Sequence, residues 1–163
     1  ASSIAGTRAD PARRWPALFA PLPASVLEFV VVWAWHAPAL HHAARASTGT
    51  MVLEQASFLA VGLLLWMSAF GGDRRSRRDR AAAGIGGLLL ASMHMTLLGV
   101  LLALASRPLY SHVALHASGL SPLQDQHLGG VLMLAIGGST YLAGGLWLLA
   151  GLLRESRRAV ADG

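Results

Sequence analysis

The sequence contains no cysteine and no lysine, and it has few charged residues of any kind. Without cysteine the chain cannot form a disulfide, a thiolate metal site or a catalytic thiol. Charged residues make up 13% of the 163 residues and hydrophobic residues 54%. An ordinary soluble domain carries about twice that charged fraction, so the composition is typical of a membrane protein.

Long apolar runs account for most of the chain. They cover residues 24–45, 51–71, 82–106 and 128–153, and each is longer than the ~20 residues that a helix needs to cross a bilayer. We therefore predict an all-α, polytopic membrane protein with four transmembrane helices in a bundle. The predicted organisation is an N-terminal cytoplasmic or interfacial segment, a membrane domain and a cytoplasmic tail, over residues 1–23, 24–153 and 154–163. The sequence has no initiator methionine and no signal-peptide core, so we expect a processed chain or a piece of a longer protein.

The basic residues are all arginines, and their placement predicts the orientation. They cluster before the first run, between the second and third, and after the fourth, whereas the other two connections hold only Arg45 and Arg107. By the positive-inside rule both termini and the middle loop are cytoplasmic. We therefore expect a multi-pass protein of the bacterial inner membrane whose other two connections face the periplasm. The basic charge then reports orientation and contact with the lipid bilayer, and no nucleic-acid partner is expected.

None of the seven histidines falls in a segment predicted to be cytoplasmic. Pro38 should kink the first helix where these histidines begin, because proline cannot continue the hydrogen-bond ladder. Imidazole with thioether and carboxylate, in the absence of cysteine, favours copper, whereas zinc would leave the methionines without a use. The candidate metal ligands, all predicted to lie in the outer half of the bundle, are His36, His41, His42, Glu54, Met93, His94, Asp125, His127 and Met133.

The segment Leu90–Leu102 carries Met93, His94 and Met95 near the middle of the third run. An ionisable residue at that depth is usually functional. Adjacent helical residues point about 100° apart, so one methionine together with His94, but not all three residues, can face the same ion. Hydrogen bonding of His94 to a serine or threonine on another helix is the structural alternative.

Three other features of the sequence have structural readings. Glu28 lies in the first run, where pairing with Arg13 or Arg14 is expected, and Glu54 is expected in the first turn of the second helix, where the helix dipole favours a carboxylate. Glycines at 130, 137 and 144 repeat every seven residues, which predicts a face for close helix packing.

Several short motifs occur in a fixed order between residues 33 and 134. They are Trp35-His36-Ala37-Pro38-Ala39-Leu40, then Glu54 with Phe58, Gly62 and Trp66, then Pro108-Leu109-Tyr110, and then Ser121-Pro122-Leu123 with Asp125-Gln126, Gly130 and Met133. In this order they resemble the CtaG-like family of cytochrome c oxidase assembly factors. Gln55 stands where that family commonly has histidine, Leu134 where it commonly has tryptophan, and the family's histidine-containing N-terminal helices are missing. The resemblance implies site roles for His36, Glu54, Asp125 and Met133.

The resemblance also implies a function in maturing a haem-copper oxidase. We expect a membrane factor that binds copper in the outer half of the bundle and delivers it or helps to insert it, with oxidase subunits or copper chaperones as partners. Whether the chain forms a homo-oligomer stays open. One alternative is a metal-free accessory subunit of a respiratory complex. Another is a membrane cytochrome in which His36 and His94 ligate haem. We expect no enzymatic activity, because the sequence shows no nucleophile and base set and no phosphate loop.

Overall fold

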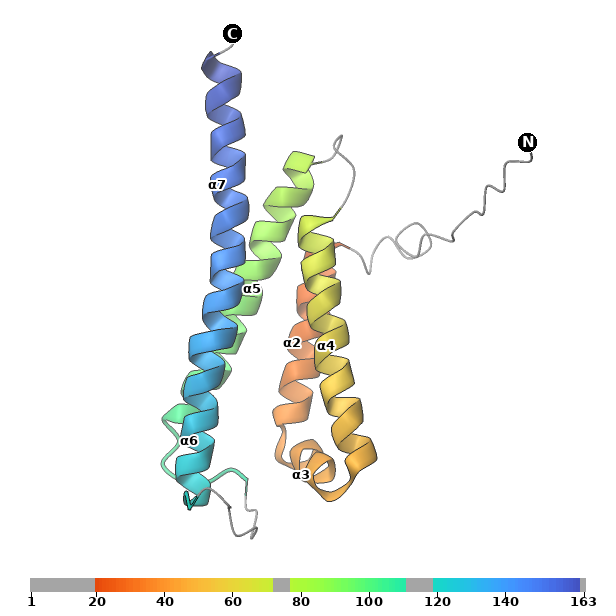
Figure 1. Ribbon diagram of the computed structural model, residues 1–163, viewed down its shortest axis with the longest axis vertical. Coiled ribbons are helices and arrows are strands. Elements are labelled where there is room, and N and C mark those ends of the chain that lie inside the picture. Colours follow the sequence, from red (N-terminus) through yellow and green to blue (C-terminus); the bar gives the residue numbers. More distant parts are fainter. Residues whose placement is uncertain (1–19, 72–76, 111–118, 162–163) are drawn as a thin grey trace, which may run out of the picture.

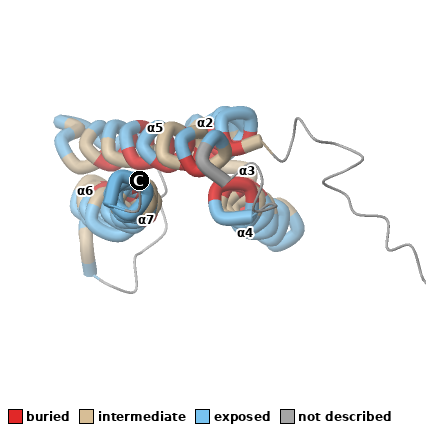
Figure 2. Tube along the Cα trace, turned by 90° about the horizontal axis from the view of Figure 1, so that it is seen from above, coloured by how far each residue is buried: buried red, intermediate tan, exposed pale blue. Residues whose placement is uncertain are grey.

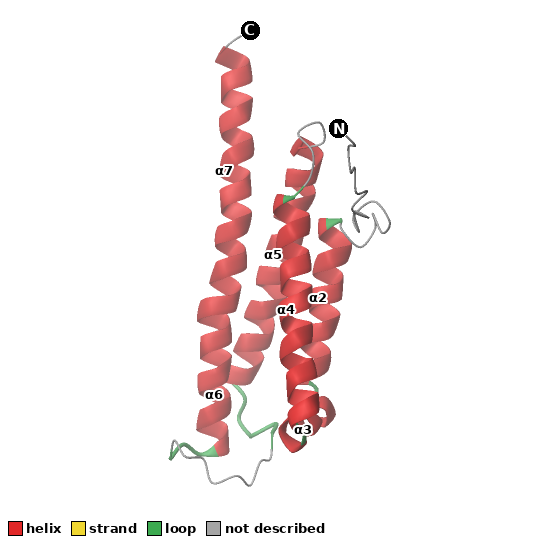
Figure 3. Cartoon of the chain, turned by 45° about the vertical axis from the view of Figure 1, so that its right-hand side comes forward, coloured by secondary structure: helices red, strands yellow, loops and turns green. Residues whose placement is uncertain are grey.

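The computed structural model describes residues 20–71, 77–110 and 119–161, and all regular structure in these ranges is helical (Figure 3). This confirms the predicted all-α class. The elements in chain order are α2 Pro21–His36, α3 Pro38–Ala46, α4 Thr48–Phe70, α5 Arg77–Ala103, α6 Pro122–Leu132, the π-helical segment η2 Met133–Gly138, and α7 Ser139–Ala161.

Three helical stretches are long and apolar enough to cross a membrane. They are α4, residues 79–103 of α5, and the continuous stretch α6–η2–α7. The bent pair α2 and α3 makes a fourth span if it is counted as one. Large apolar side chains such as Leu59, Leu97 and Ile136 are exposed on the outside of the bundle, where lipid would solvate them. Several apolar helices thus indicate a membrane protein.

Pro38 breaks the first predicted helix, as expected. The axis turns by 70° between α2 and α3, Ala37 is extended at the break, and Pro38 occupies the first turn of α3. Proline suits that position because its missing N–H has no partner in a first helical turn. The short α3 therefore crosses one end of the bundle, which we call the α3 end (Figure 1).

The helices form two layers, with α2 and α5 in one and α4 and α6–η2–α7 in the other (Figure 2). α5 packs against α2, α4, α6, η2 and α7. Among the described helices, the backbone of α4 does not come close to α6, η2 or α7. Away from the α3 end the Trp66 side chain of α4 bridges this gap by stacking on Tyr141 of α7, with ring centroids 5.9 Å apart.

The helix boundaries differ from prediction at the C-terminal end. α7 continues to Ala161, so the predicted cytoplasmic tail from residue 154 is largely a continuation of the last helix, which extends beyond the other helices (Figure 1). The predicted interfacial segment, residues 1–23, lies mostly outside the described residues, and α2 already begins at Pro21.

The glycines spaced by seven residues allow close approach, which confirms the predicted packing role. A methyl group at Gly130 would lie 2.6 Å from the backbone nitrogen of Ala103, and one at Gly144 would lie 2.7 Å from the Trp66 ring. At Gly137 the nearest atom would be the methyl carbon of Met95, at 2.7 Å. Glycine is therefore needed where α6–η2–α7 meets α5 and Trp66.

Gly130→Ala is expected to destabilise the bundle by about 1–3 kcal/mol, because backbone atoms of α5 cannot move aside as a side chain can. Gly129→Ala is the matched control, since a methyl group there meets no atom within 4 Å. Denaturant unfolding of both variants in detergent micelles measures the difference. Equal stability of the two variants would contradict the predicted α5–α6 contact.

Candidate metal-binding groove

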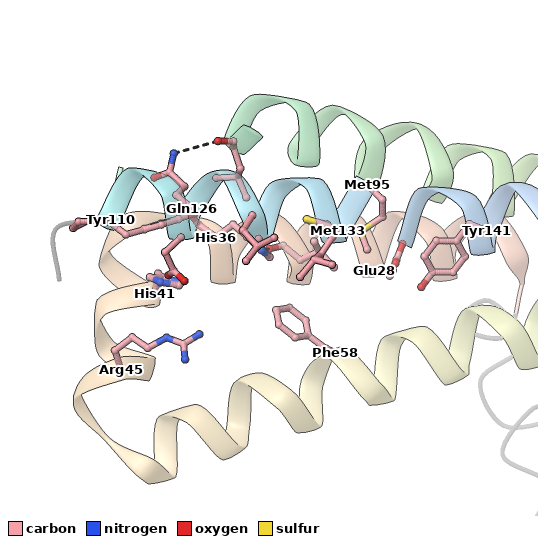
Figure 4. A pocket seen from close by; sticks show the side chains of 17 residues that line it. Glu28, His36, His41, Arg45, Phe58, Met95, Tyr110, Gln126, Met133 and Tyr141 are labelled. Atoms are coloured by element: carbon pink, nitrogen blue, oxygen red, sulfur yellow. Dashed lines mark hydrogen bonds between the residues drawn. The ribbon is translucent and has the colours of Figure 1, made fainter. Parts of the chain in front are cut away.

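A groove of about 1000 Å³ lies in the gap between α4 and the stretch α6–η2–α7. Two rows of residues spaced by four line it along its length, because residues four apart share a helix face. One row is on α2 and the other on α6 and η2: Glu28, Val32 and His36, and Asp125, Gly129 and Met133. The two helices run in opposite directions, so His36 and Asp125 belong to the α3 end, or mouth, and Glu28 and Met133 to the deep end (Figure 4).

The mouth is built around the break between α2 and α3. The Tyr110 hydroxyl donates to the carbonyl of His36 at 2.8 Å, and the Tyr110 ring stacks on His41 with centroids 3.9 Å apart. Burial raises the pKa of Tyr110 above its ordinary value, so this hydroxyl remains a donor at neutral pH. Arg45 and Asp125 also line the mouth, which therefore carries both signs of charge beside two imidazoles.

His36 has the hydrogen bond that a metal-binding imidazole usually has. Its Nδ1 lies 2.7 Å from the carbonyl of Val32, and a carbonyl can only accept, so Nδ1 carries the proton. Nε2 then keeps its lone pair on a residue that lines the groove. A backbone carbonyl bound to the other ring nitrogen is the common way in which proteins orient a ligating histidine.

The start of α6 is held in place by its own sequence. Ser121 and Gln124 form a reciprocal capping box, and Pro122 fills the first turn. The Gln126 side chain donates to the carbonyl of Leu102 at 3.3 Å (Figure 4) and accepts from the backbone of Leu109 at 2.7 Å. These bonds fix α6 against α5 and so set the position of Asp125 in the groove.

At the deep end a buried histidine and a buried glutamate form a hydrogen bond that joins α2 to α5. His94 Nε2 lies 2.8 Å from Glu28 Oε2, and the two residues are only 4% and 2% exposed. Phe29 packs its ring edge-on against His94. Tyr141 lies beside Glu28 (Figure 4), and Met95 and Met133 line the same end of the groove.

The π-helical segment η2 lies at this deep end. Ser92 of α5 donates to the carbonyl of Gly138 at 2.8 Å, and Ser139 donates to the carbonyl of Ala135. These two serine side chains thus bind backbone carbonyls that would otherwise accept hydrogen bonds from backbone amides alone. The glycines at 137 and 138 allow α5 to lie close to this segment. Wider turns of this kind are frequent at functional sites. Here the segment contributes Met133 to the groove.

The groove brings together four of the predicted ligands, namely His36, His41, Asp125 and Met133. The other five lie elsewhere. Met93 is 68% exposed on the outside of α5, so the structure does not bring it to the groove. His42 is bonded to the carbonyl of Pro38 in its own helix, and His127 to the carbonyl of Ala105, where it holds the loop after α5.

Three expectations about buried carboxylates and His94 are corrected. Glu28 pairs with His94, whereas Arg13 and Arg14 lie outside the described residues. For the same reason His94 has a glutamate, not a serine or threonine, as its partner. Glu54 is past the first turn of α4, which begins at Thr48, so it is not a helix-terminal carboxylate. It is 4% exposed, accepts from Gln55, and does not line the groove.

Sequence reasoning missed Glu28 and Tyr141 as groove residues, and it left open whether Met93 or Met95 faces an ion. The spacing of Glu28, Val32 and His36 by four residues was a visible signal that the first two share a helix face with the histidine. Met95 could not be distinguished from Met93 by composition or depth. No signal in the sequence marks Tyr141, because its position depends on the turn geometry of η2.

The geometry gives no support to a haem held between His36 and His94. His94 is level with Glu28 and Phe29 of α2, and His36 follows Glu28 by eight residues. At 1.5 Å per residue this separates the two histidines by about 12 Å along the helix. Axial haem ligands instead face one another across the ring.

Comparison with known proteins identifies the family. The model of the cytochrome c oxidase caa3 assembly factor family (Caa3_CtaG) matches residues 5–155, most of the chain. The chain belongs to this family. A search of curated proteins gave no match, and neither did a search of solved structures. Membership supports a role in the assembly of cytochrome c oxidase and an association with that enzyme.

The family resemblance seen in the sequence now has a structural counterpart. In the motif that begins at Trp35, the indole donates to Ser57 of α4 at 2.8 Å, His36 faces the groove and Pro38 makes the bend. In the motif that begins at Ser121, Asp125 faces the groove and Gln126 anchors α6. In the described parts of the chain, no three side chains from histidine, cysteine, aspartate and glutamate gather closely enough to hold a metal ion.

Proposed function

We propose that this member of the oxidase assembly factor family binds copper in the groove and delivers it to an oxidase subunit, or helps to insert it. The observation that supports the proposal most directly is the mouth of the groove. His36, His41 and Asp125 all line it, the bond from Nδ1 of His36 to Val32 leaves Nε2 of the neutral imidazole as a donor to metal, and imidazole with carboxylate suits Cu(II). The arginine pattern predicts that this mouth faces the periplasm, where copper is loaded in our proposal.

Deleting the gene for this chain is expected to lower the cytochrome c oxidase activity of the bacterium, and expression of the full chain should restore that activity. His36→Gln combined with Asp125→Asn is expected to fail to restore activity, because it removes two donors from the mouth. His42→Gln is the matched control, since His42 does not line the groove. Unchanged oxidase activity in the strain without the chain would contradict the proposal.

Elemental analysis and a visible spectrum of the same purified sample test the metal directly. We expect up to one Cu(II) per chain at the mouth, lost in the His36 and Asp125 double variant and kept in His42→Gln. Retained Cu(II) in the double variant would reject the mouth as a copper site. A Soret band would instead favour the haem alternative.

A metal-free accessory role is the second candidate, and the lack of a three-residue cluster of histidine and acidic side chains among the described residues favours it. In that case the open groove is a surface for an oxidase subunit. Co-purification of the chain with oxidase subunits, without copper in either the wild type or the variants, would select this function over copper delivery.

A further inference from the structure

Three donor side chains from three different segments meet at the deep end of the groove. Glu28 comes from α2, Met95 from α5 and Met133 from η2, and all three line the same cavity. In Figure 4 the two sulfur atoms and the carboxylate project into the same part of the groove. Met133 is one of the predicted ligands, and Met95 is one of the two methionines between which the sequence left the choice open.

The position of Met95 depends on Gly137. A methyl group at residue 137 would lie 2.7 Å from the terminal carbon of Met95, so the Met95 side chain lies directly over that glycine. Met93 is two residues earlier, which turns it about 200° around the helix, and it is 68% exposed. One helix thus carries two methionines at nearly the same depth, one inside the groove and one outside the bundle.

His94 orients Glu28 and does not itself line the groove. Its Nε2 is bonded to Glu28, and its buried Nδ1 has no hydrogen-bond partner. With the proton on Nε2, His94 donates its N–H to Glu28, and only the weak acceptor Nδ1 stays unpaired. With the proton on Nδ1, a buried donor would stay unpaired and Nε2 would face the carboxylate with a lone pair, which costs more free energy. The carboxylate accepts this bond, lies beside the Tyr141 hydroxyl, and keeps further lone pairs for the groove.

The donor set favours a soft monovalent cation. Thioethers select Cu(I) among biological metals, whereas hard cations prefer an all-oxygen shell and zinc prefers histidine, cysteine and carboxylate. The guanidinium among the groove-lining residues, that of Arg45, belongs to the mouth. A single positive charge beside Glu28 would neutralise the buried carboxylate, which is costly to leave uncompensated.

We propose that Glu28, Met95 and Met133 form a Cu(I) site at the deep end of the groove, with His94 as a positioning residue for Glu28. The inference rests on the proposed function, because it treats copper as the cargo. It adds a second site, distinct in ligands and in depth from the histidines of the mouth. Copper would enter among imidazoles and carboxylate and be held further in by thioethers.

The test loads the purified full chain with one equivalent of Cu(I) under anaerobic conditions. X-ray absorption at the copper edge should show sulfur neighbours. The double variant Met95→Leu, Met133→Leu should lose them and bind Cu(I) at least about 10- to 100-fold more weakly in competition with a Cu(I) chelator. Met93→Leu is the matched control and should retain both signals. Sulfur neighbours in the double variant, or their loss in Met93→Leu, would overturn the proposal.

The role of His94 needs its own pair of variants. His94→Gln keeps a donor that can reach Glu28 and should keep most of the Cu(I) affinity. His94→Leu should lose about tenfold or more, as is usual for a residue that orients a ligand. Glu28→Gln retains an oxygen that accepts from His94 but lacks the charge, and it should also weaken binding. Equal Cu(I) affinity in all three variants would remove both residues from the site.

The outcomes separate this proposal from the proposed function. Copper that shows no sulfur neighbours and is lost in the His36 and Asp125 variant would reject the deep site and leave copper delivery standing. Normal oxidase activity in a strain lacking the chain would reject copper delivery, whatever the purified protein binds.

Discussion

Glu28→Leu is expected to destabilise the folded protein by about 1–3 kcal/mol, the usual cost of leaving a buried hydrogen-bonding group without its partner. The variant leaves His94, which is 4% exposed, with neither ring nitrogen paired. His94→Leu should cost about 3–5 kcal/mol, because the buried Glu28 carboxylate loses its histidine donor and keeps only the neighbouring Tyr141 hydroxyl.

The double variant Glu28→Leu, His94→Leu should be more stable than either single variant. Replacing both members of a buried pair with apolar side chains of similar size is often neutral, and α2 and α5 then meet through hydrocarbon alone. The coupling energy between the two substitutions is therefore expected to be large. The wild type and the double variant should both be more stable than either single variant.

Denaturant unfolding of the four proteins in mixed micelles measures this cycle. Additive effects of the two substitutions would show that the 2.8 Å contact does not couple the residues in solution. Phe29→Leu, in the residue that packs edge-on against His94, is a control for loss of packing, and we expect it to cost less than either member of the pair. A stable double variant would also supply a folded protein that lacks the carboxylate of the proposed Cu(I) site.

Most of the architecture was predictable because it depends on local patterns. Apolar runs longer than a bilayer thickness marked the helices. Pro38 marked the bend of 70°, because proline interrupts a helix when it falls in the interior of an apolar run. The glycines at 130, 137 and 144 marked a packing face, because absence of a side chain is itself the property that close helices need.

The site was less predictable because it depends on which way each helix turns its faces. Glu28 and His94 are 66 residues apart in the chain, and either of them alone has several possible partners. Met93 and Met95 are alike in composition and depth, and only the rotation of α5 in the bundle separates them. The π-helical segment adds to this, because it changes the angular register between Met133 and Tyr141 relative to a regular α-helix.

Gly129→Trp is expected to separate the mouth of the groove from its deep end. Gly129 is four residues after Asp125 and four before Met133 on the same groove-lining face. No atom lies within 4 Å of a methyl group built there, so the first carbon of a larger side chain meets no neighbour, and we expect an indole to extend into the groove. The ring would then occupy the path between the two sets of donors.

If copper passes inward along the groove, this variant should keep the fold and copper at the mouth but lose delivery. Oxidase activity should fall to the level of a strain without the chain, and Cu(I) binding with sulfur neighbours should weaken by about 10- to 100-fold, as it does when a metal site is disturbed. Leu104→Trp, at a highly exposed position after α5 outside the groove, is the matched control and should restore the oxidase. Full oxidase activity with Gly129→Trp would mean that cargo reaches the oxidase without passing the middle of the groove.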